Sequence, residues 1–193
     1  MPSGISINGC AGSGKTTLAK ALAIHLGFRH LDLDDYYWRK GTEIPYTEMN
    51  AQADIIKSLA DDISKQSHFV MSGSIGSILW DFVNPLFDLA VLVQTPASIC
   101  LERVKKRAFE KFGDRVCAGG DLYHNHLNFY KQIELYEAGE NPAYSLARHE
   151  KWAAELRCPV LQIDGTNLIA DNVSLISEYF NSANVNLNSS GIR

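Results

Sequence analysis

Short apolar runs alternate with segments of helical periodicity along most of the chain. Five such runs predict strands, at residues 5–7, 30–33, 69–71, 89–93 and 160–163. Between and after the strands, apolar residues recur every three or four positions, which predicts helices at about 18–26, 47–65, 96–111 and from the last strand to about 180. The run at 89–93 is the most continuous, as expected of a central parallel strand. The alternation predicts an α/β fold with a five-stranded parallel sheet and helices on both faces.

Two segments interrupt the alternation. Residues from about 112 to 140 carry glycines among charged and aromatic residues, with one helical piece near 127–136, and predict a lid inserted over the edge of the sheet. Residues 181–193 contain four Asn and three Ser, a composition typical of a disordered tail. We therefore expect one folded domain over residues 1–180, followed by that tail.

Length, charge and cysteine content narrow the class of protein. The chain has 193 residues, which suits one domain, and its net charge of −4 argues against a general nucleic-acid or membrane-surface role. No apolar run reaches the roughly 18 residues that a spanning helix needs, and no secretory signal is recognisable. The four cysteines lack Cys-x-x-Cys spacing, which favours reduced thiols. We expect a cytoplasmic monomer or homodimer that binds neither nucleic acid nor membrane.

The strongest motif follows the first strand. The segment Gly9-Cys10-Ala11-Gly12-Ser13-Gly14-Lys15-Thr16 matches the phosphate-loop pattern G-x-x-x-x-G-K-[ST], between a strand and an amphipathic helix. Glycines let successive N–H groups turn toward phosphate oxygens, and the helix N-terminus adds partial positive charge. Lys15 can reach the β- and γ-phosphates, and the Thr16 hydroxyl can ligate Mg²⁺. The predicted nucleotide-binding residues are Gly9, Cys10, Ala11, Gly12, Ser13, Gly14, Lys15, Thr16 and Thr17.

Three carboxylates follow the second strand. Strand alternation would place Asp32 and Asp34 on one side and Asp35 on the other. Ligands collect at the carboxyl ends of parallel strands, so the cluster should face the phosphate loop. Such closely spaced like charges need a cation or hydroxyl partner, although a solvated turn with a helix cap is the alternative.

Residues 5–38 resemble the opening of the small P-loop kinases. The similarity to cytidylate kinase is close through Gly27, Asp32-x-Asp34 resembles shikimate kinase, and Asp35-Tyr36-Tyr37 resembles uridine kinase. The resemblance implies a P-loop NTPase fold in which one Asp helps hold hydrated Mg²⁺ and another engages an acceptor hydroxyl. We expect Asp32 in the metal role with Thr16, Asp34 as the residue that takes the hydroxyl proton, and Asp35 beside the substrate. Cytidylate kinase, however, has Thr-Gly where this chain has Leu33-Asp34, so the resemblance names a superfamily and not a substrate.

Small residues follow the third strand, where many P-loop proteins carry an aspartate. Gly73 and Ser74 would allow close approach of the substrate, although they also fit a plain strand-to-helix turn. Shikimate kinase is similar in placing glycines here.

Six basic residues lie between positions 102 and 115 of this acidic protein. Arg103 and Arg107 share a helix face, and the kinase resemblance implies lid arginines that clamp phosphates. Arg107 and Arg115 are the preferred lid residues, with a solvated basic face as the alternative and Arg148 as a weaker candidate.

The loop after the last strand contains Gly165 and Thr166, whose counterparts in related kinases hold adenine through the backbone. The sequence lacks the guanine signature Asn-Lys-x-Asp, so ATP is the expected nucleotide. These residues predict a kinase that transfers the γ-phosphoryl group of MgATP to the hydroxyl of a small metabolite or nucleoside. Two alternatives stay open: a nucleoside monophosphate kinase, against which Asp34 and Asp35 count by charge, and a nucleotide-dependent regulator or ATPase without a small acceptor.

Overall fold

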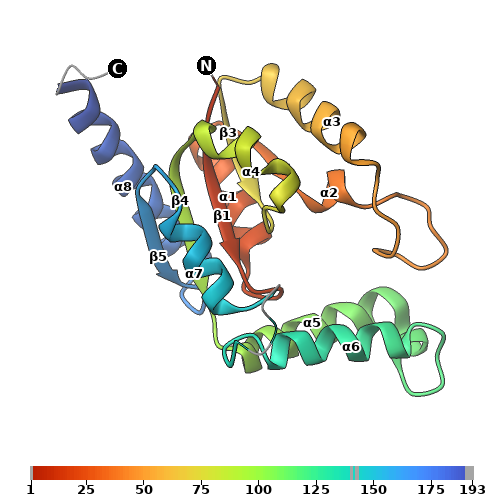
Figure 1. The fold of residues 1–193 in the computed structure, drawn as a ribbon. Coiled ribbons are helices and arrows are strands. Elements are labelled where there is room, and N and C mark those ends of the chain that lie inside the picture. The colour runs from red at the N-terminus through yellow and green to blue at the C-terminus, as the bar shows by residue number, and fades with distance from the viewer. Residues whose placement is uncertain (1, 140, 142–143, 190–193) are drawn as a thin grey trace.

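A five-stranded parallel sheet forms the centre of the protein (Figure 1). The computed structural model describes residues 2–139, 141 and 144–189. The strands are β1 (Ser3–Gly9), β2 (Arg29–Asp32), β3 (His68–Ser72), β4 (Phe87–Gln94) and β5 (Val160–Asp164). Their order in the sheet is β2-β3-β1-β4-β5, with every pairing parallel. All five strands expected from the apolar runs are therefore present.

Helices cover both faces of this sheet. They are α1 (Lys15–Leu26), α2 (Asp34–Tyr37), α3 (Gln52–Ser64), α4 (Ser77–Val83), α5 (Ala97–Phe112), α6 (Tyr123–Glu134), α7 (Leu146–Ala154) and α8 (Ile169–Ser189), with short 3₁₀ turns at Asn84–Leu86 and Gly113–Val116. Helices α1 and α8 pack on one face against alternate residues of the central strands, such as Ile5, Ile7 and Val91. Helices α3 and α4 pack on the other face against Phe69 and Met71. This is the three-layer α/β fold that the sequence predicted.

The helix expected at 47–65 begins later than the periodicity suggested. It starts at Gln52, and residues 39–50 form a loop instead. Asn50 explains the difference, because its side-chain amide donates to the Tyr36 carbonyl at 2.7 Å and its backbone N–H donates to the Tyr37 carbonyl at 2.8 Å. Those bonds hold the chain in an extended path up to Ala51.

The last helix is longer than expected. We predicted its end at about residue 180, whereas α8 continues to Ser189. Extending a helix that is already anchored by packing costs much less than starting one, which lets it run into a polar segment. The final part of the expected tail, residues 190–193, lies outside the described residues.

Residues 112–140, where we expected an inserted lid, contain the second 3₁₀ turn and α6, and α6 packs with α5 as a helical hairpin. These two helices lie side by side beyond the carboxyl edge of the sheet (Figure 1). Ala108 of α5, Val116 of the 3₁₀ turn and Leu122 form its small buried core. The helical piece expected at 127–136 is α6, which begins earlier, at Tyr123. We use the name "hairpin" for residues 97–134.

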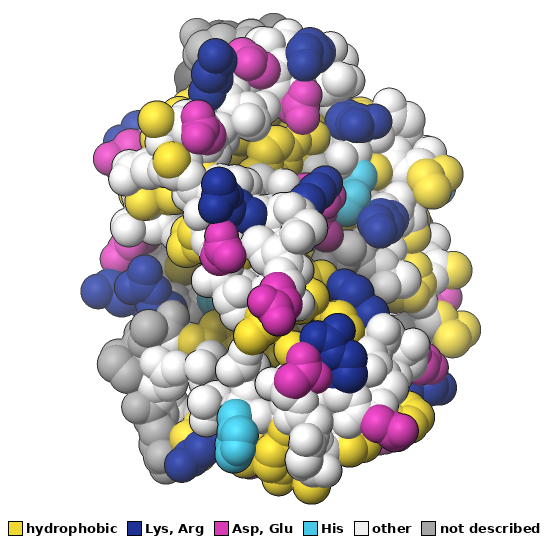
Figure 2. Space-filling view, turned by 90° about the vertical axis from the view of Figure 1, so that its right-hand side faces the viewer, with side chains coloured by type: hydrophobic (Ala, Val, Ile, Leu, Met, Phe, Trp, Pro, Cys, Tyr) yellow, Lys and Arg dark blue, Asp and Glu magenta, His cyan; other side chains and the backbone are white. Residues whose placement is uncertain are grey.

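On the described part of the face in Figure 2, acidic and basic side chains are interspersed with hydrophobic ones, so this face carries no continuous basic patch. Among the described residues, no helix combines the length and the apolar character needed to cross a membrane.

Candidate nucleotide and phosphoryl-acceptor site

The phosphate loop packs so tightly that glycine is required at two of its positions. A Cβ on Gly12 would lie 2.3 Å from the Cys100 carbonyl oxygen, and one on Gly9 would lie 2.5 Å from the Val93 carbonyl oxygen. Both glycines and Gly14 have positive φ, at 87°, 153° and 95°. The loop is therefore wedged against β4 and the start of α5, and it leads directly into the N-terminus of α1. This is the geometry that presents backbone N–H groups to phosphate.

Lys15 extends back into this loop. Its ammonium donates to the Cys10 carbonyl oxygen at 3.4 Å, which is a long bond. Burial lowers the pKa of Lys15, while the charges of Asp34 and Cys10 oppose that change and Arg107 adds to it. Asp34, at the start of α2, and Arg107 of the hairpin therefore both lie near enough to Lys15 to act on it electrostatically.

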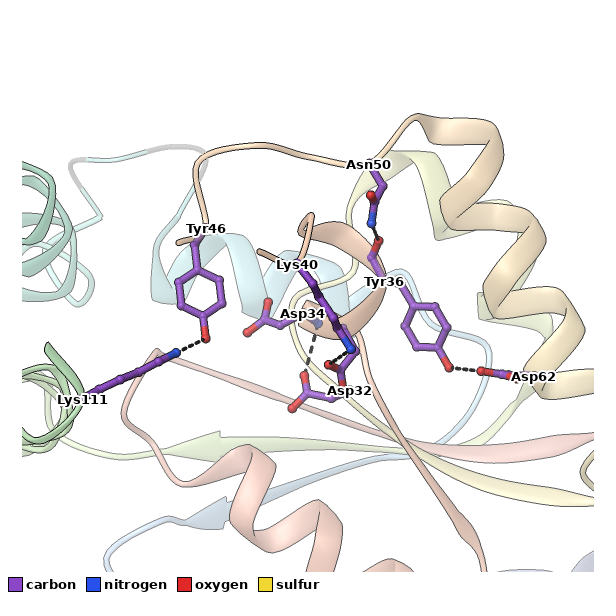
Figure 3. A network of polar contacts seen from close by, with 9 residues as sticks. Asp32, Asp34, Tyr36, Lys40, Tyr46, Asn50, Asp62 and Lys111 are labelled. Carbon is purple, nitrogen blue, oxygen red and sulfur yellow. Dashed lines mark hydrogen bonds and ion pairs between the residues drawn. The ribbon is translucent and has the colours of Figure 1, made fainter. Parts of the chain in front are cut away.

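The acidic cluster adopts a different backbone from the one assumed from strand alternation. β2 ends at Asp32, Leu33 has helical dihedrals, and Asp34 opens the one-turn helix α2. The Asp34 backbone N–H donates to a carboxylate oxygen of Asp32 at 3.2 Å, and both carboxylates lie on the same side of the chain (Figure 3). Asp35 instead pairs with Lys40 at 3.1 Å. The arrangement of Asp32 and Asp34 thus comes from a helical turn and not from the strand that the sequence analysis assumed.

The surroundings of Asp34 disfavour the ionised form of its carboxyl group. Desolvation raises the pKa of this carboxyl group, and repulsion from Asp32 raises it further. Lys15, a hydrogen bond with Trp38 and the charge of Arg107 act in the opposite direction. A carboxylate in this state gains free energy from a cation or from a hydroxyl donor, and it is a better proton acceptor than an ordinary Asp.

Thr16 and Asp32 supply hard oxygen donors that fit Mg²⁺. Within the described ranges, no three His, Cys, Asp or Glu side chains gather into a closed metal site. Mg²⁺ does not require one, because it is usually held by one or two protein oxygens together with phosphates and waters. The donor set at the phosphate loop therefore suits a metal that arrives with a nucleotide.

A cavity of about 730 Å³ lies next to the phosphate loop. Its walls come from the end of β1, from α2 and its following loop, from α4 and from α7. The lining residues are Asn8, Tyr37, Trp38, Met49, Ser74, Ile75, Gly76, Ser77, Ile78, Trp80, Asp81, Tyr144, Arg148, His149, Lys151, Trp152 and Glu155. Its volume suits a small organic ligand. Of the two small residues predicted to approach a substrate, Ser74 lines the cavity, whereas Gly73 packs against Leu33.

The α7 wall of the cavity was missed by sequence reasoning, apart from Arg148. His149 is buried, its Nδ1 lies 2.6 Å from the Tyr136 hydroxyl, and desolvation lowers its pKa to about 4. The histidine is therefore neutral at physiological pH. The helix start was nevertheless visible in the sequence, because Ser145 is an N-cap that accepts from the Arg148 N–H at 3.2 Å.

The predicted adenine loop is tied to the phosphate loop by Arg103. The Arg103 guanidinium donates to the carbonyl oxygens of Gly12 at 3.3 Å and Gly165 at 3.4 Å. Thr166 shapes the loop by donating its N–H and its hydroxyl to Asp164, each at 2.7 Å. The sequence analysis singled out Arg103 only because it shares a helix face with Arg107. In the structure, Arg103 links the phosphate loop to the loop after β5.

The two preferred lid arginines differ in their surroundings. Arg107 influences both Lys15 and Asp34 electrostatically, as described above. Arg115 lies past the end of α5 and forms a two-pronged ion pair with Asp121, at 2.6 Å and 3.0 Å. A phosphate role for Arg115 stays a prediction and would require this exposed pair to open.

The loop of residues 39–50 connects the acidic cluster to the hairpin. The Lys111 ammonium lies 5.0 Å from the centre of the Tyr46 ring and donates to its hydroxyl at 3.3 Å (Figure 3). Tyr46 also makes an edge contact with Trp38, and Ile44 packs against the hairpin core. The hairpin thus contacts the segment that carries one wall of the cavity.

Several known protein families and structures are similar to this chain. A protein-family model described as an AAA domain matches residues 5–115, which include the phosphate loop, the acidic cluster and α5. The chain belongs to the small P-loop kinase superfamily. It is 34% identical to the uncharacterized protein YqaC of Bacillus subtilis over 94% of this chain and 99% of that protein.

More distant members of the superfamily carry functional names. The chain is 28% identical to a cytidylate kinase of Pyrococcus horikoshii, over 78% of this chain and 82% of that enzyme. A gluconokinase structure from Sinorhizobium meliloti has a TM-score of 0.56 at 17% identity and covers 99% of this chain and 98% of its own. That last similarity concerns the fold alone.

Proposed function

We propose that this protein transfers the γ-phosphoryl group of MgATP to the hydroxyl of a small metabolite or nucleoside bound in the cavity beside α7. The observation that carries the proposal is that Lys15 and Arg107 both act electrostatically on Asp34, while a ligand-sized cavity lies beside the end of β1 that leads into the phosphate loop. Two cations thus act on a carboxyl group whose pKa is raised, which suits a site where negative phosphate and a hydroxyl proton meet.

Each predicted residue has a role in this proposal. The amides from Gly9 to Thr17 hold the phosphates, and Gly165 and Thr166 border the adenine. Thr16 and Asp32 hold Mg²⁺, which would neutralise phosphate charge when bound. Lys15 and Arg107 face the β- and γ-phosphates, joined by Arg115 if its pair with Asp121 opens, while Ser74 and its neighbour Gly73 border the acceptor.

The transfer itself is an in-line displacement. The acceptor oxygen forms a bond to the γ-phosphorus while the bond from that phosphorus to the β–γ bridging oxygen breaks, so that ADP leaves with the electron pair. The Asp34 carboxylate accepts the hydroxyl proton. Positioning by the cavity and charge stabilisation by Lys15 and Arg107 supply most of the rate acceleration.

A nucleoside monophosphate is the second candidate acceptor. Arg148 and Lys151 of α7 line the cavity and could hold an acceptor phosphate, and the cytidylate kinase relative supports the idea. The charge of Asp34 and Asp32 counts against a phosphate acceptor placed close to them.

The test compares acceptors by mass-spectrometric detection of the phosphorylated product. The purified protein is incubated with MgATP and two panels, one of hydroxyl-bearing metabolites and nucleosides and one of nucleoside monophosphates. With the best acceptor, Asp34→Asn should lower the transfer rate by roughly 10²–10⁴ while ATP affinity stays near normal. Asp61→Asn, on the exposed face of α3, is the matched control.

Full transfer activity in Asp34→Asn would exclude the hydroxyl mechanism. Higher activity of that variant on nucleoside monophosphates would establish the second candidate. MgATP turnover without any phosphorylated organic product would favour an ATPase or nucleotide-dependent regulator.

A further inference from the structure

Tyr144 lies between the phosphate loop and the acceptor cavity. Its ring lines the cavity, and its hydroxyl oxygen accepts the backbone N–H of Ala11 at 2.5 Å. Ala11 is the third residue of the phosphate-loop motif, so this phenol from the far end of the sequence contacts the loop that should hold the transferred phosphate. Sequence reasoning gave Tyr144 no role, because 133 residues separate it from Ala11.

The surroundings of Tyr144 fix its ring. The ring lies 5.5 Å from that of Tyr136 and 6.1 Å from that of His149, measured between centroids. The Tyr136 hydroxyl and the His149 Nδ1 are themselves hydrogen-bonded. Tyr144 also belongs to the apolar cluster that joins the loop residue Cys10 to Cys100 and Val104 of α5. A side chain packed in this way holds its hydroxyl in place without further cost in side-chain entropy when a ligand binds.

The hydroxyl proton of Tyr144, in contrast, has a poor partner. It points to the Cys10 sulfur at 3.7 Å, and a thiol sulfur is a weak acceptor. Burial raises the pKa of Tyr144 well above that of an ordinary tyrosine, so the group keeps its proton at neutral pH. Because its oxygen already accepts an N–H bond, the O–H is polarised into a stronger donor. Turning this O–H from sulfur to a phosphate oxygen would exchange a weak bond for a charge-assisted one.

We propose that Tyr144 is a catalytic residue that donates a hydrogen bond to the phosphoryl group during its transfer from ATP to the acceptor. The inference rests on the proposed kinase function and deepens it. In this step the acceptor oxygen bonds to the γ-phosphorus, the bond to the bridging oxygen of ADP breaks, and Asp34 takes the acceptor proton. Tyr144 neither gains nor loses a proton, and its O–H stabilises charge on an equatorial oxygen of the phosphoryl group.

The experiment uses ligands that do not depend on the acceptor. Isothermal titration calorimetry on the full chain measures the affinities for MgADP and for MgADP with aluminium fluoride. Aluminium fluoride imitates the phosphoryl group in the transition state of transfer. Tyr144→Phe keeps the ring and removes the hydroxyl. It should weaken the aluminium fluoride complex roughly tenfold or more while the affinity for MgADP alone changes less than about twofold.

Tyr130→Phe is the matched control, since this ring packs in the same cluster beneath Lys105. It should leave both affinities unchanged. Unchanged binding of the aluminium fluoride complex by Tyr144→Phe overturns the inference. Equal losses for both ligands also overturn it, because Tyr144 would then only shape the loop, and a gain in MgADP affinity would mean that Tyr144 obstructs the nucleotide.

The same data separate the inference from the proposed function. If the wild-type protein binds MgADP and prefers the aluminium fluoride complex but Tyr144→Phe behaves identically, the kinase proposal stands and the role of Tyr144 fails. If the wild-type protein binds neither ligand, both fail.

Discussion

Replacing Lys15 with methionine should stabilise the free protein while removing most of its response to ATP. Burial lowers the pKa of Lys15, which means that the folded protein disfavours the charged form. Its one hydrogen bond within the loop, to the Cys10 carbonyl, is long at 3.4 Å. Methionine keeps the apolar stem and removes the charge. We expect a gain of about 1 kcal/mol in the free energy of unfolding, or roughly 2–4 °C in Tm for a domain of this size.

The effect on ligand binding has the opposite sign. Hydrogen bonds to charged groups contribute roughly 1.5–3 kcal/mol, so loss of the Lys15–phosphate contacts should raise the Kd for MgATP about 10- to 150-fold. At a ligand concentration about 100 times the wild-type Kd, the wild-type protein gains about 2.7 kcal/mol. A variant with a Kd about 100-fold higher gains only about 0.4 kcal/mol under the same conditions. The Tm shift caused by MgATP should fall from roughly 5–11 °C to about 1–2 °C.

Thermal unfolding with and without MgATP measures both effects in one experiment. Lys20→Met, an exposed lysine on the same helix, should leave the MgATP-induced shift at its wild-type value. Two results would refute the reasoning: a free Lys15→Met protein that melts lower than the wild type, or one that keeps the full shift with MgATP. The first would mean that Lys15 stabilises the fold, and the second that it does not contact phosphate.

Four further predictions concern the same site. Arg107→Ala should lower kcat roughly 10²-fold, more than it weakens ATP binding, because the charge that it meets grows in the transition state; equal effects in steady-state kinetics and equilibrium titration would contradict this. Hydrogen exchange across residues 112–140 should slow when MgATP and acceptor are both present, and equal protection with and without them would rule out a closing lid. The transfer rate should decline as the pH falls through the raised pKa of Asp34. The pH–rate profile of Asp34→Asn should lack this decline. Because a raised folded-state pKa disfavours the ionised form, Asp34→Asn should also raise Tm at neutral pH, with the gain disappearing below the ordinary Asp pKa of 3.8.

The layers of the fold and the phosphate loop were predictable because they depend on local patterns. Buried parallel strands are continuous apolar runs, and the loop from Gly9 to Thr16 carries its chemistry in consecutive residues. The sequence also predicted that the acidic cluster faces the phosphate loop, since the carboxyl ends of parallel strands lie at one edge of the sheet, and Asp34 does act electrostatically on Lys15.

The remaining parts of the site depend on contacts between distant segments. Tyr144 contacts Ala11 because the chain returns to the sheet after the hairpin. The hydrophobic periodicity of the sequence does not indicate such a contact. Helix α2 is one turn long, too short for a periodic signal, so the Asp32–Asp34 backbone was taken for a strand. Asn50 delays the start of the helix expected at 47–65 until Gln52 through two hydrogen bonds to α2, a tertiary effect that overrides helix propensity.

The loop of residues 39–50 makes the hairpin and the acidic cluster mechanically dependent on each other. Asn50 joins one end of the loop to α2 by a hydrogen bond. Tyr46 contacts Lys111 of the hairpin, and Ile44 packs against the apolar core of the hairpin. An exposed cation–π contact contributes only roughly 0.5–1 kcal/mol, so little free energy opposes the separation of Tyr46 from Lys111. We therefore expect a ligand that displaces α2 to weaken the contact between Tyr46 and Lys111 as well, so that α2 and the hairpin would respond together.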